Sequence, residues 1–179
     1  MGITTKTGDK GKTALISGER IFKDDLRIEL VGELDELCSF LGTAKSLIKP
    51  QADKKMVESI QVDLFTLGAE VASGPLHVMK LKKRITGACV CFLDEQAGIL
   101  EKALKDRKFC FCLPGENVIS GTLDVARAVA RRCERKATTL AKKRITRNPH
   151  ILAYLNRLSD LLYLLARKNE ASPKPLKNR

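Results

Sequence analysis

The sequence predicts an all-α fold, an up-and-down bundle of five helices. Aromatic residues make up only 4% of the 179 residues, and leucine and alanine fill many of the apolar positions. This composition favours helices over sheets. Apolar residues recur three or four positions apart in five separate segments, and no alternating pattern is long enough to predict a sheet.

The first two helices have clear start and stop signals. Either Asp24 or Asp25 can cap the first helix, which we expect to run to about residue 48, just before Pro50. The second helix follows and is expected to end at Ser73-Gly74-Pro75, because glycine and proline both interrupt helices. Short connections of this kind join antiparallel neighbours.

The remaining helices are separated by breaks of the same type. A third helix is expected over residues 85–104, and a short apolar piece at 109–113 follows it. The fourth is expected from about residue 120 to 145. Asn148-Pro149 then breaks the chain, with the proline well placed to start the fifth helix.

The chain length and charge indicate one domain with an anionic partner. We expect a single domain over residues 1–170, followed by a basic, disordered tail at 171–179. The net charge of +12 indicates nucleic acid, an acidic membrane surface or a nucleoside triphosphate as partner. No apolar run approaches the roughly 20 residues that span a bilayer, and no targeting segment is apparent, so we expect a cytoplasmic protein.

The six cysteines do not have the spacing of a metal site. Cys89 and Cys91 form one C-x-C pair and Cys110 and Cys112 another, whereas zinc and iron–sulfur sites typically use C-x-x-C. We expect reduced thiols without a bound metal.

The segment at residues 4–13 has the chemistry of a polyphosphate-binding loop. Gly8 and Gly11 allow main-chain N–H groups to converge on an anion, while lysines and threonines supply charge and hydroxyl groups, and Asp9 can hold Mg²⁺. The segment is not a Walker A loop. A Walker A loop has four residues between its first glycine and Gly-Lys-Thr, and this chain has two. The alternative is a flexible basic N-terminus.

A second group of candidate phosphate-binding residues lies on the fourth helix. Arg127, Arg131 and Glu134 share one face of it, and Glu134 can orient Arg131 or bind a water on Mg²⁺. Asp35 on the first helix needs a cation, for which Arg127 is a candidate, and Asn156 on the fifth suits a ribose or a base edge. The alternative is a solvated basic helix.

Six stretches in both halves of the chain together resemble one family. They are Thr5-Lys6-Thr7-Gly8-Asp9-Lys10-Gly11, Lys23-Asp24-Asp25, Gly32-Glu33-Leu34-Asp35-Glu36-Leu37, Phe111-Cys112-Leu113-Pro114-Gly115, residues 126–135 and Tyr154-Leu155-Asn156-Arg157-Leu158-Ser159-Asp160. In this order the set resembles the PduO-type ATP:cob(I)alamin adenosyltransferases.

The resemblance implies a homotrimer with active sites between neighbouring subunits, and ATP, Mg²⁺ and cob(I)alamin as ligands. It implies an ATP site formed by Thr5, Lys6, Thr7, Gly8, Thr13, Ala14, Lys23, Arg131, Arg132, Glu134, Arg135 and Asn156. Phe111 would lie under the corrin ring, and Asp35 would pair with Arg127 across the subunit boundary. The implied reaction is attack of cob(I)alamin on C5′ of ATP, with a reductase or an adenosylcobalamin-dependent enzyme as a further partner.

The chain departs from the family pattern at a few positions, and two other functions stay open. Cys38 stands where the family usually has Asn, Glu116 replaces a glycine, and Asp124 replaces a common His, so corrinoid affinity is expected to differ. These acids favour a corrinoid or ATP carrier without turnover. The charge of +12 favours a basic, helical nucleic-acid-binding protein, although stacking aromatics are missing near the basic runs.

Overall fold

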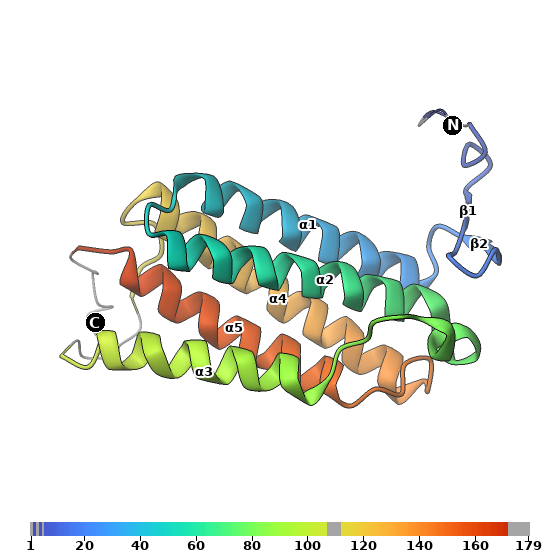
Figure 1. Ribbon diagram of the computed structural model, residues 1–179. Coiled ribbons are helices and arrows are strands. Elements are labelled where there is room, and N and C mark those ends of the chain that lie inside the picture. Colours follow the sequence, from blue (N-terminus) through green and yellow to red (C-terminus); the bar gives the residue numbers. More distant parts are fainter. Residues whose placement is uncertain (1, 3, 5, 107–111, 172–179) are drawn as a thin grey trace, which may run out of the picture.

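The computed structural model describes residues 2, 4, 6–106 and 112–171. This part of the chain forms a bundle whose helices run alternately up and down (Figure 1). The helices are α1 (Leu26–Leu47), α2 (Gln51–His77), α3 (Gly87–Ala103), α4 (Val118–Lys142) and α5 (His150–Lys168), with a short 3₁₀-helix η1 (Val78–Lys80) after α2. The predicted all-α, five-helix fold is confirmed.

The start of α1 follows the predicted cap. Asp25 is the residue before the helix, and its carboxylate accepts a hydrogen bond from the Arg27 N–H at 2.9 Å. This bond satisfies one of the N–H groups that a helix start leaves unpaired. Between the two candidates, Asp24 and Asp25, the structure therefore selects Asp25.

The predicted end of the second helix is a kink. Gly74 has φ 61° and ψ 179°, after which helical geometry resumes through Pro75 to His77. A positive φ is open to glycine and strained for other residues, and proline fits the first turn of a helix because it needs no N–H donor there. The pair therefore ends the long helical stretch at Gly74, where the sequence predicts a stop, and one further helical turn follows in a new direction.

The expectation of no strands is wrong at the N-terminus. Strands β1 (Lys12–Ala14) and β2 (Arg20–Phe22) form an antiparallel hairpin with Thr13 opposite Ile21. Three residues a strand are too few to produce a recognisable alternation, which explains the error. The turn between them is closed by a 2.8 Å bond from Leu15 N–H to Glu19 O.

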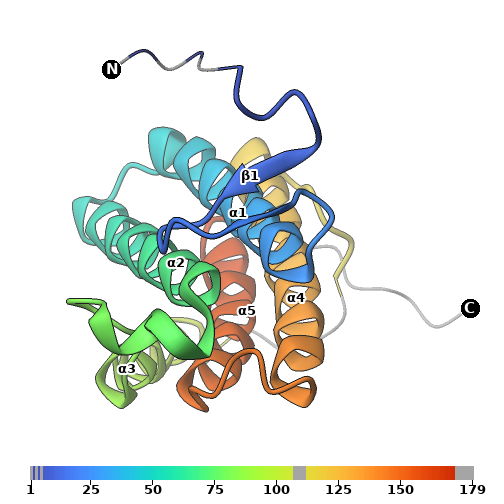
Figure 2. The ribbon, with the colours of Figure 1, turned by 90° about the vertical axis from the view of Figure 1, so that its right-hand side faces the viewer.

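A leucine-rich core holds the bundle, and a smaller apolar cluster attaches the hairpin to it. In the bundle α1 packs against α2 and α4, and α5 packs against α4 and α3 (Figure 2). Leu15 and Ile21 of the hairpin bury against Ala72 of α2, with Ile28 and Val31 of α1 beside them. Because this contact fixes the hairpin over one end of α1 and α2, it also fixes the residues that the hairpin presents.

None of the helices in the described ranges is both long and apolar enough to cross a membrane. The predicted tail lies outside the described residues from position 172 onward, and so do Phe111 and most of the apolar piece at 109–113.

Candidate functional site

The first part of the site is a cavity of about 680 Å³ beside the hairpin, α1 and α2, which we call the hairpin pocket. Four predicted site residues line it: Thr13, Ala14, Lys23 and Asp35. Its remaining wall is largely apolar and includes Phe65 and Ile16, whose exposed fractions are 70% and 68%. The pocket thus joins a hydroxyl and an ammonium group to an apolar wall, a combination that suits a nucleoside phosphate.

The N-terminal segment is tied to this hairpin. Lys23 N–H donates to Gly11 O at 2.9 Å, and Arg20 Nη2 donates to Thr7 O at 2.9 Å. The Lys23 ammonium lies against Gly8, since a β-carbon there would be 3.1 Å from Lys23 Nζ. Lys23 is exposed. The sequence separates Gly8 from Lys23, and the hairpin brings them together.

Main-chain N–H groups contribute less to the predicted phosphate loop than expected. The N–H of Asp9 donates to Lys6 O at 3.3 Å and that of Gly11 to Gly8 O at 3.2 Å, so turns inside the loop already use both. The side chains of Lys6 and Thr7 are exposed, and Thr5 lies outside the described residues.

The second part of the site is a cavity of about 320 Å³ between α4 and α5, which we call the α4–α5 pocket. Arg127 and Arg131 line it from α4, one helical turn apart, and Asp160 and Tyr163 line it from α5. Guanidinium groups bind phosphate oxygens in pairs of hydrogen bonds. This pocket can therefore take an anionic group, with carboxylates nearby to balance the charge.

Other predicted residues lie one or two turns further along the same helices. Asn156 Nδ2 donates to Glu134 Oε1 at 3.4 Å, which joins α5 to α4, and Arg135 Nη1 donates to Arg131 O at 3.1 Å. Arg132 turns the other way, toward α1, where it pairs with Glu33 at 3.2 Å and with Glu36.

Acids of α1 also neutralise Lys136 of α4, one helical turn after Arg132. Lys136 Nζ lies 2.7 Å from Glu29 Oε2 and 3.0 Å from Glu33 Oε1. Part of the basic run on α4 is thus paired within the chain. This pairing weakens the nucleic-acid hypothesis, which needs these charges for phosphate contacts.

The hairpin pocket and the α4–α5 pocket share no lining residue in the described part of the chain. Asp35 lines the hairpin pocket and Arg127 the α4–α5 pocket, and within the chain Arg127 Nε pairs with Asp124 Oδ1 at 3.3 Å. The residues that the sequence assigns to one ATP site therefore form two separate half-sites in a single chain. Phe111, predicted for the corrinoid side, is not among the described residues.

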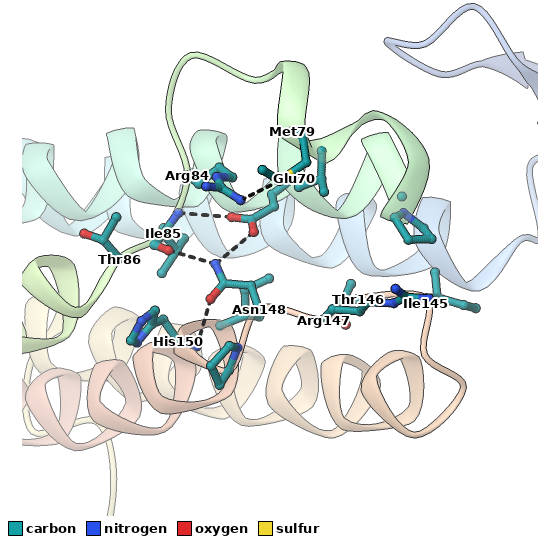
Figure 3. A pocket seen from close by; sticks show the side chains of 15 residues that line it. Glu70, Met79, Arg84, Ile85, Thr86, Ile145, Thr146, Arg147, Asn148 and His150 are labelled. Carbon is teal, nitrogen blue, oxygen red and sulfur yellow. Dashed lines mark hydrogen bonds between the residues drawn. The ribbon is translucent and has the colours of Figure 1, made fainter.

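A third cavity, of about 570 Å³, lies where α2 and the loop between α4 and α5 meet (Figure 3). None of the predicted site residues that the structure describes lines it. Glu70, only 3% exposed, accepts from Ile85 N–H at 3.0 Å and from Asn148 Nδ2 at 2.8 Å. Both carboxylate oxygens are engaged in joining three segments of the chain, so we interpret this cavity as a structural junction.

Sequence reasoning missed a buried ionic group beside the α4–α5 pocket. Asp124 and Arg167 are each 5% exposed and Glu170 is 2% exposed. From the sequence, Asp124 stands out only as a departure from the family pattern. The available signal was the three-residue spacing from Asp124 to Arg127 within α4 and from Arg167 to Glu170 at the end of α5.

The helical bundle and its two pockets, each with charged side chains in its lining, define the class, a helical protein with small-molecule pockets beside its helices. The family model described as cobalamin adenosyltransferase matches residues 3–169. The chain therefore belongs to the cobalamin adenosyltransferase family.

Named relatives match over nearly the whole chain. A corrinoid adenosyltransferase of Citrobacter freundii is 37% identical over 96% of both chains, and one of Bacillus subtilis is 36% identical over 93% of this chain and 86% of its own. The PduO corrinoid adenosyltransferase of Citrobacter freundii is 34% identical, and the match covers 95% of this chain and 50% of that longer protein.

Solved structures of the PduO type share the fold. A phenylalanine-to-alanine variant of the PduO-type ATP:corrinoid adenosyltransferase from Lactobacillus reuteri, complexed with cobalamin and ATP, superimposes with a TM-score of 0.88 at 31% identity, covering 99% of this chain and 100% of that one. An arginine-to-lysine variant from the same organism, complexed with ATP, gives the same TM-score over 98% of this chain and 100% of its own.

Proposed function

We propose that this chain transfers the 5′-deoxyadenosyl group of ATP to cob(I)alamin, giving adenosylcobalamin and triphosphate. The observation that carries the proposal is the match to a PduO-type structure that holds both cobalamin and ATP, at a TM-score of 0.88 over 99% of this chain. Relatives of the same length with the name corrinoid adenosyltransferase support it.

The reaction needs positioning and charge more than an activated side chain. The electron pair of Co(I) attacks C5′, a cobalt–carbon bond forms, and the C5′–O bond breaks so that triphosphate leaves with the bonding pair. Cobalt supplies the nucleophile, so the protein has to hold two substrates in line and stabilise the leaving anion. Preorganised cations beside a leaving anion are an efficient means of doing so.

The two half-sites fit these tasks. We assign Lys23, Thr13 and the loop at Gly8 to the ATP phosphates from one side, and Arg131 with the Glu134–Asn156 pair to ATP from the other. Mg²⁺ would be held through ATP, with Glu134 as a candidate for a water-mediated contact. We assign the rim of this site to four other predicted ATP-binding residues, Lys6, Thr7, Ala14 and Arg135.

The separation of the half-sites supports a homotrimer in which neighbouring copies complete each site. Within one chain, none of the residues that the structure describes lines both the hairpin pocket and the α4–α5 pocket. The exposed Phe65 and Ile16 beside Asp35 form an apolar surface of the kind that subunit contacts cover. We assign this surface to a second copy of the chain, with Asp35 facing Arg127 of that copy.

An anaerobic assay with ATP, Mg²⁺ and chemically reduced cob(I)alamin tests the function. We expect adenosylcobalamin and triphosphate in equal amounts. Normal ATP binding without product would support the carrier hypothesis over the enzyme hypothesis.

In the cell, the expected partner is a reductase that supplies cob(I)alamin or an enzyme that uses adenosylcobalamin. A cytoplasmic location stays a prediction from the sequence.

A further inference from the structure

We propose that Asp124 and Arg167 are positioning residues for the α4–α5 pocket: together they hold Arg127 and Tyr163 in place from behind the pocket wall. This inference rests on the proposed function, because it assigns an effect on ATP use to residues that do not touch ATP. Neither residue lines the pocket itself.

Asp124 connects the pocket wall to the interior through its two oxygens. Oδ1 accepts from Arg127 Nε at 3.3 Å, and Oδ2 accepts from Arg167 Nη2 at 2.5 Å. The Asp124 side chain is 5% exposed, whereas that of Arg127 is 31% exposed. One buried carboxylate thus ties an accessible arginine to a buried one.

Arg167 supports the opposite wall. Its guanidinium carbon lies 5.0 Å from the centre of the Tyr163 ring, and its Nη2 lies 2.8 Å from Glu170 Oε1. Tyr163 lines the α4–α5 pocket, as Arg127 does. The same ion pair therefore touches a pocket residue on α4 and another on α5, and it sets the spacing between them.

Such support matters because a free arginine side chain has many rotamers, and ordering them on binding lowers affinity. The bond to Asp124 uses Nε of Arg127, so the two Nη groups can pair with the Asp35 carboxylate of the neighbouring copy without breaking it. Asp124 thus holds the guanidinium in the position that closes the ATP site against that copy before ATP arrives. This arrangement is preorganisation by a residue that the ligand does not contact.

The test is Asp124→Asn, which keeps the shape and removes the charge. We expect the KM for ATP to rise, and the ATP affinity measured by calorimetry to fall, by about tenfold, within the range of couplings between contacting residues. Most of the effect should disappear in an Arg127→Ala background, which leaves only the part that Asp124 exerts through Arg167 and Tyr163. If Asp124→Asn does not fold, Arg167→Lys replaces it as the test. This variant keeps the positive charge but loses the planar contact with Tyr163, so we expect it to weaken ATP binding as well.

Asp53→Asn is the matched control. Asp53 is 6% exposed, and both its oxygens accept from Lys168 Nζ at 2.8 Å, one residue along α5 from Arg167. This pair joins α5 to α2 and lines neither half-site. We expect Asp53→Asn to lower Tm as Asp124→Asn does while leaving the KM for ATP unchanged.

The outcomes separate this inference from the proposed function. A wild-type chain without adenosylcobalamin formation would remove the proposed function. An active wild type in which Asp124→Asn and Asp53→Asn lose only stability, with equal KM for ATP, would overturn the positioning role and leave the proposed function intact.

Discussion

At the scale of single residues, Arg131 has the clearest assignment. It lines the α4–α5 pocket beside Arg127, and its own carbonyl accepts from Arg135 at 3.1 Å. The neighbouring basic residue Arg132 is instead paired with Glu33 and Glu36 of α1. Two adjacent arginines of one helix are therefore available for different tasks, one for a ligand and one for packing α4 on α1.

Arg131→Ala is expected to reduce adenosylcobalamin formation about 100-fold, as is typical when one charge-stabilising group is removed from an active site. The control is Lys142→Ala, which removes an exposed positive charge at the end of the same helix and outside both half-sites. Initial rates under anaerobic conditions measure both. Equal activity of the two variants would show that Arg131 has no role in the site.

Cys133 should be inert in the folded chain. Burial, with a smaller contribution from the Glu33 carboxylate, raises the pKa of the Cys133 thiol to about 12. The thiolate fraction at pH 8 is then on the order of 10⁻⁴, against about 0.1 for a thiol of pKa 9. Alkylation followed by mass spectrometry should label the exposed Cys91 in the native protein and Cys133 only in denaturant. Labelling of both at one rate would contradict this assignment.

Residue spacing on one helix could be predicted from the sequence, and contacts between distant segments could not. The helical period places Arg127 and Arg131 on one face, and the structure puts both in the α4–α5 pocket. The approach of Lys23 to Gly8, in contrast, depends on a hairpin too short to leave a pattern. The Asp124–Arg167 pair joins positions 43 residues apart. The helical period relates residues of one helix only, so it could not predict this pair.

At the scale of elements, the cap of α1 makes a pH-dependent contribution to stability. A hydrogen bond from the Arg27 side chain is the main cause that lowers the pKa of Asp25 below its ordinary 3.8. A carboxylate with a lowered pKa contributes stability that is present above its unfolded pKa and lost as the pH falls through the folded one. The contribution should therefore be complete at neutral pH and vanish in strong acid.

Asp25→Asn keeps a capping side chain and removes the charge, so we expect a loss of about 0.5 kcal/mol in the free energy of unfolding at pH 7, as for other partly exposed pairs. The difference from wild type should shrink below about pH 4. Urea denaturation at pH 7 and pH 3 measures it, with the exposed neighbour changed by Asp24→Asn as control. A difference that stays constant with pH would exclude the ionic contribution.

Helix boundaries could be predicted where a side chain or a proline sets them, and less well where backbone geometry does. Asp25 and Pro149 stand directly before α1 and α5, as expected. At Gly74 the positive φ interrupts the helix as the glycine and proline predict, but the further helical turn through His77 could not be predicted from them. Leu15 and Ile21 hold the hairpin against Ala72. Strands of three residues leave no sequence pattern from which this tertiary contact could be predicted.

At the scale of the whole molecule, the separation of the two half-sites within one chain is the reason for proposing that neighbouring copies complete each active site. The hairpin presents Lys23 beside α1 and α2, whereas Arg131 faces outward between α4 and α5. A closed ring of copies places the first surface of each subunit against the second surface of its neighbour, and it repeats the contact without leaving an open end. Every site then takes its lysine from one copy and its arginine from the next.

Complementation tests this arrangement. Lys23→Ala and Arg131→Ala should each be nearly inactive alone. Co-expressed with different tags and purified on both tags as mixed trimers, they should recover about a third of wild-type activity. A site is intact only when an Arg131→Ala subunit supplies the hairpin and a Lys23→Ala subunit supplies α4, and every mixed ring has one such site among its three. A site contained within one chain predicts no recovery, because every chain then has one damaged half. The double variant Lys23→Ala/Arg131→Ala, mixed with either single variant, is the control and should stay inactive under both arrangements.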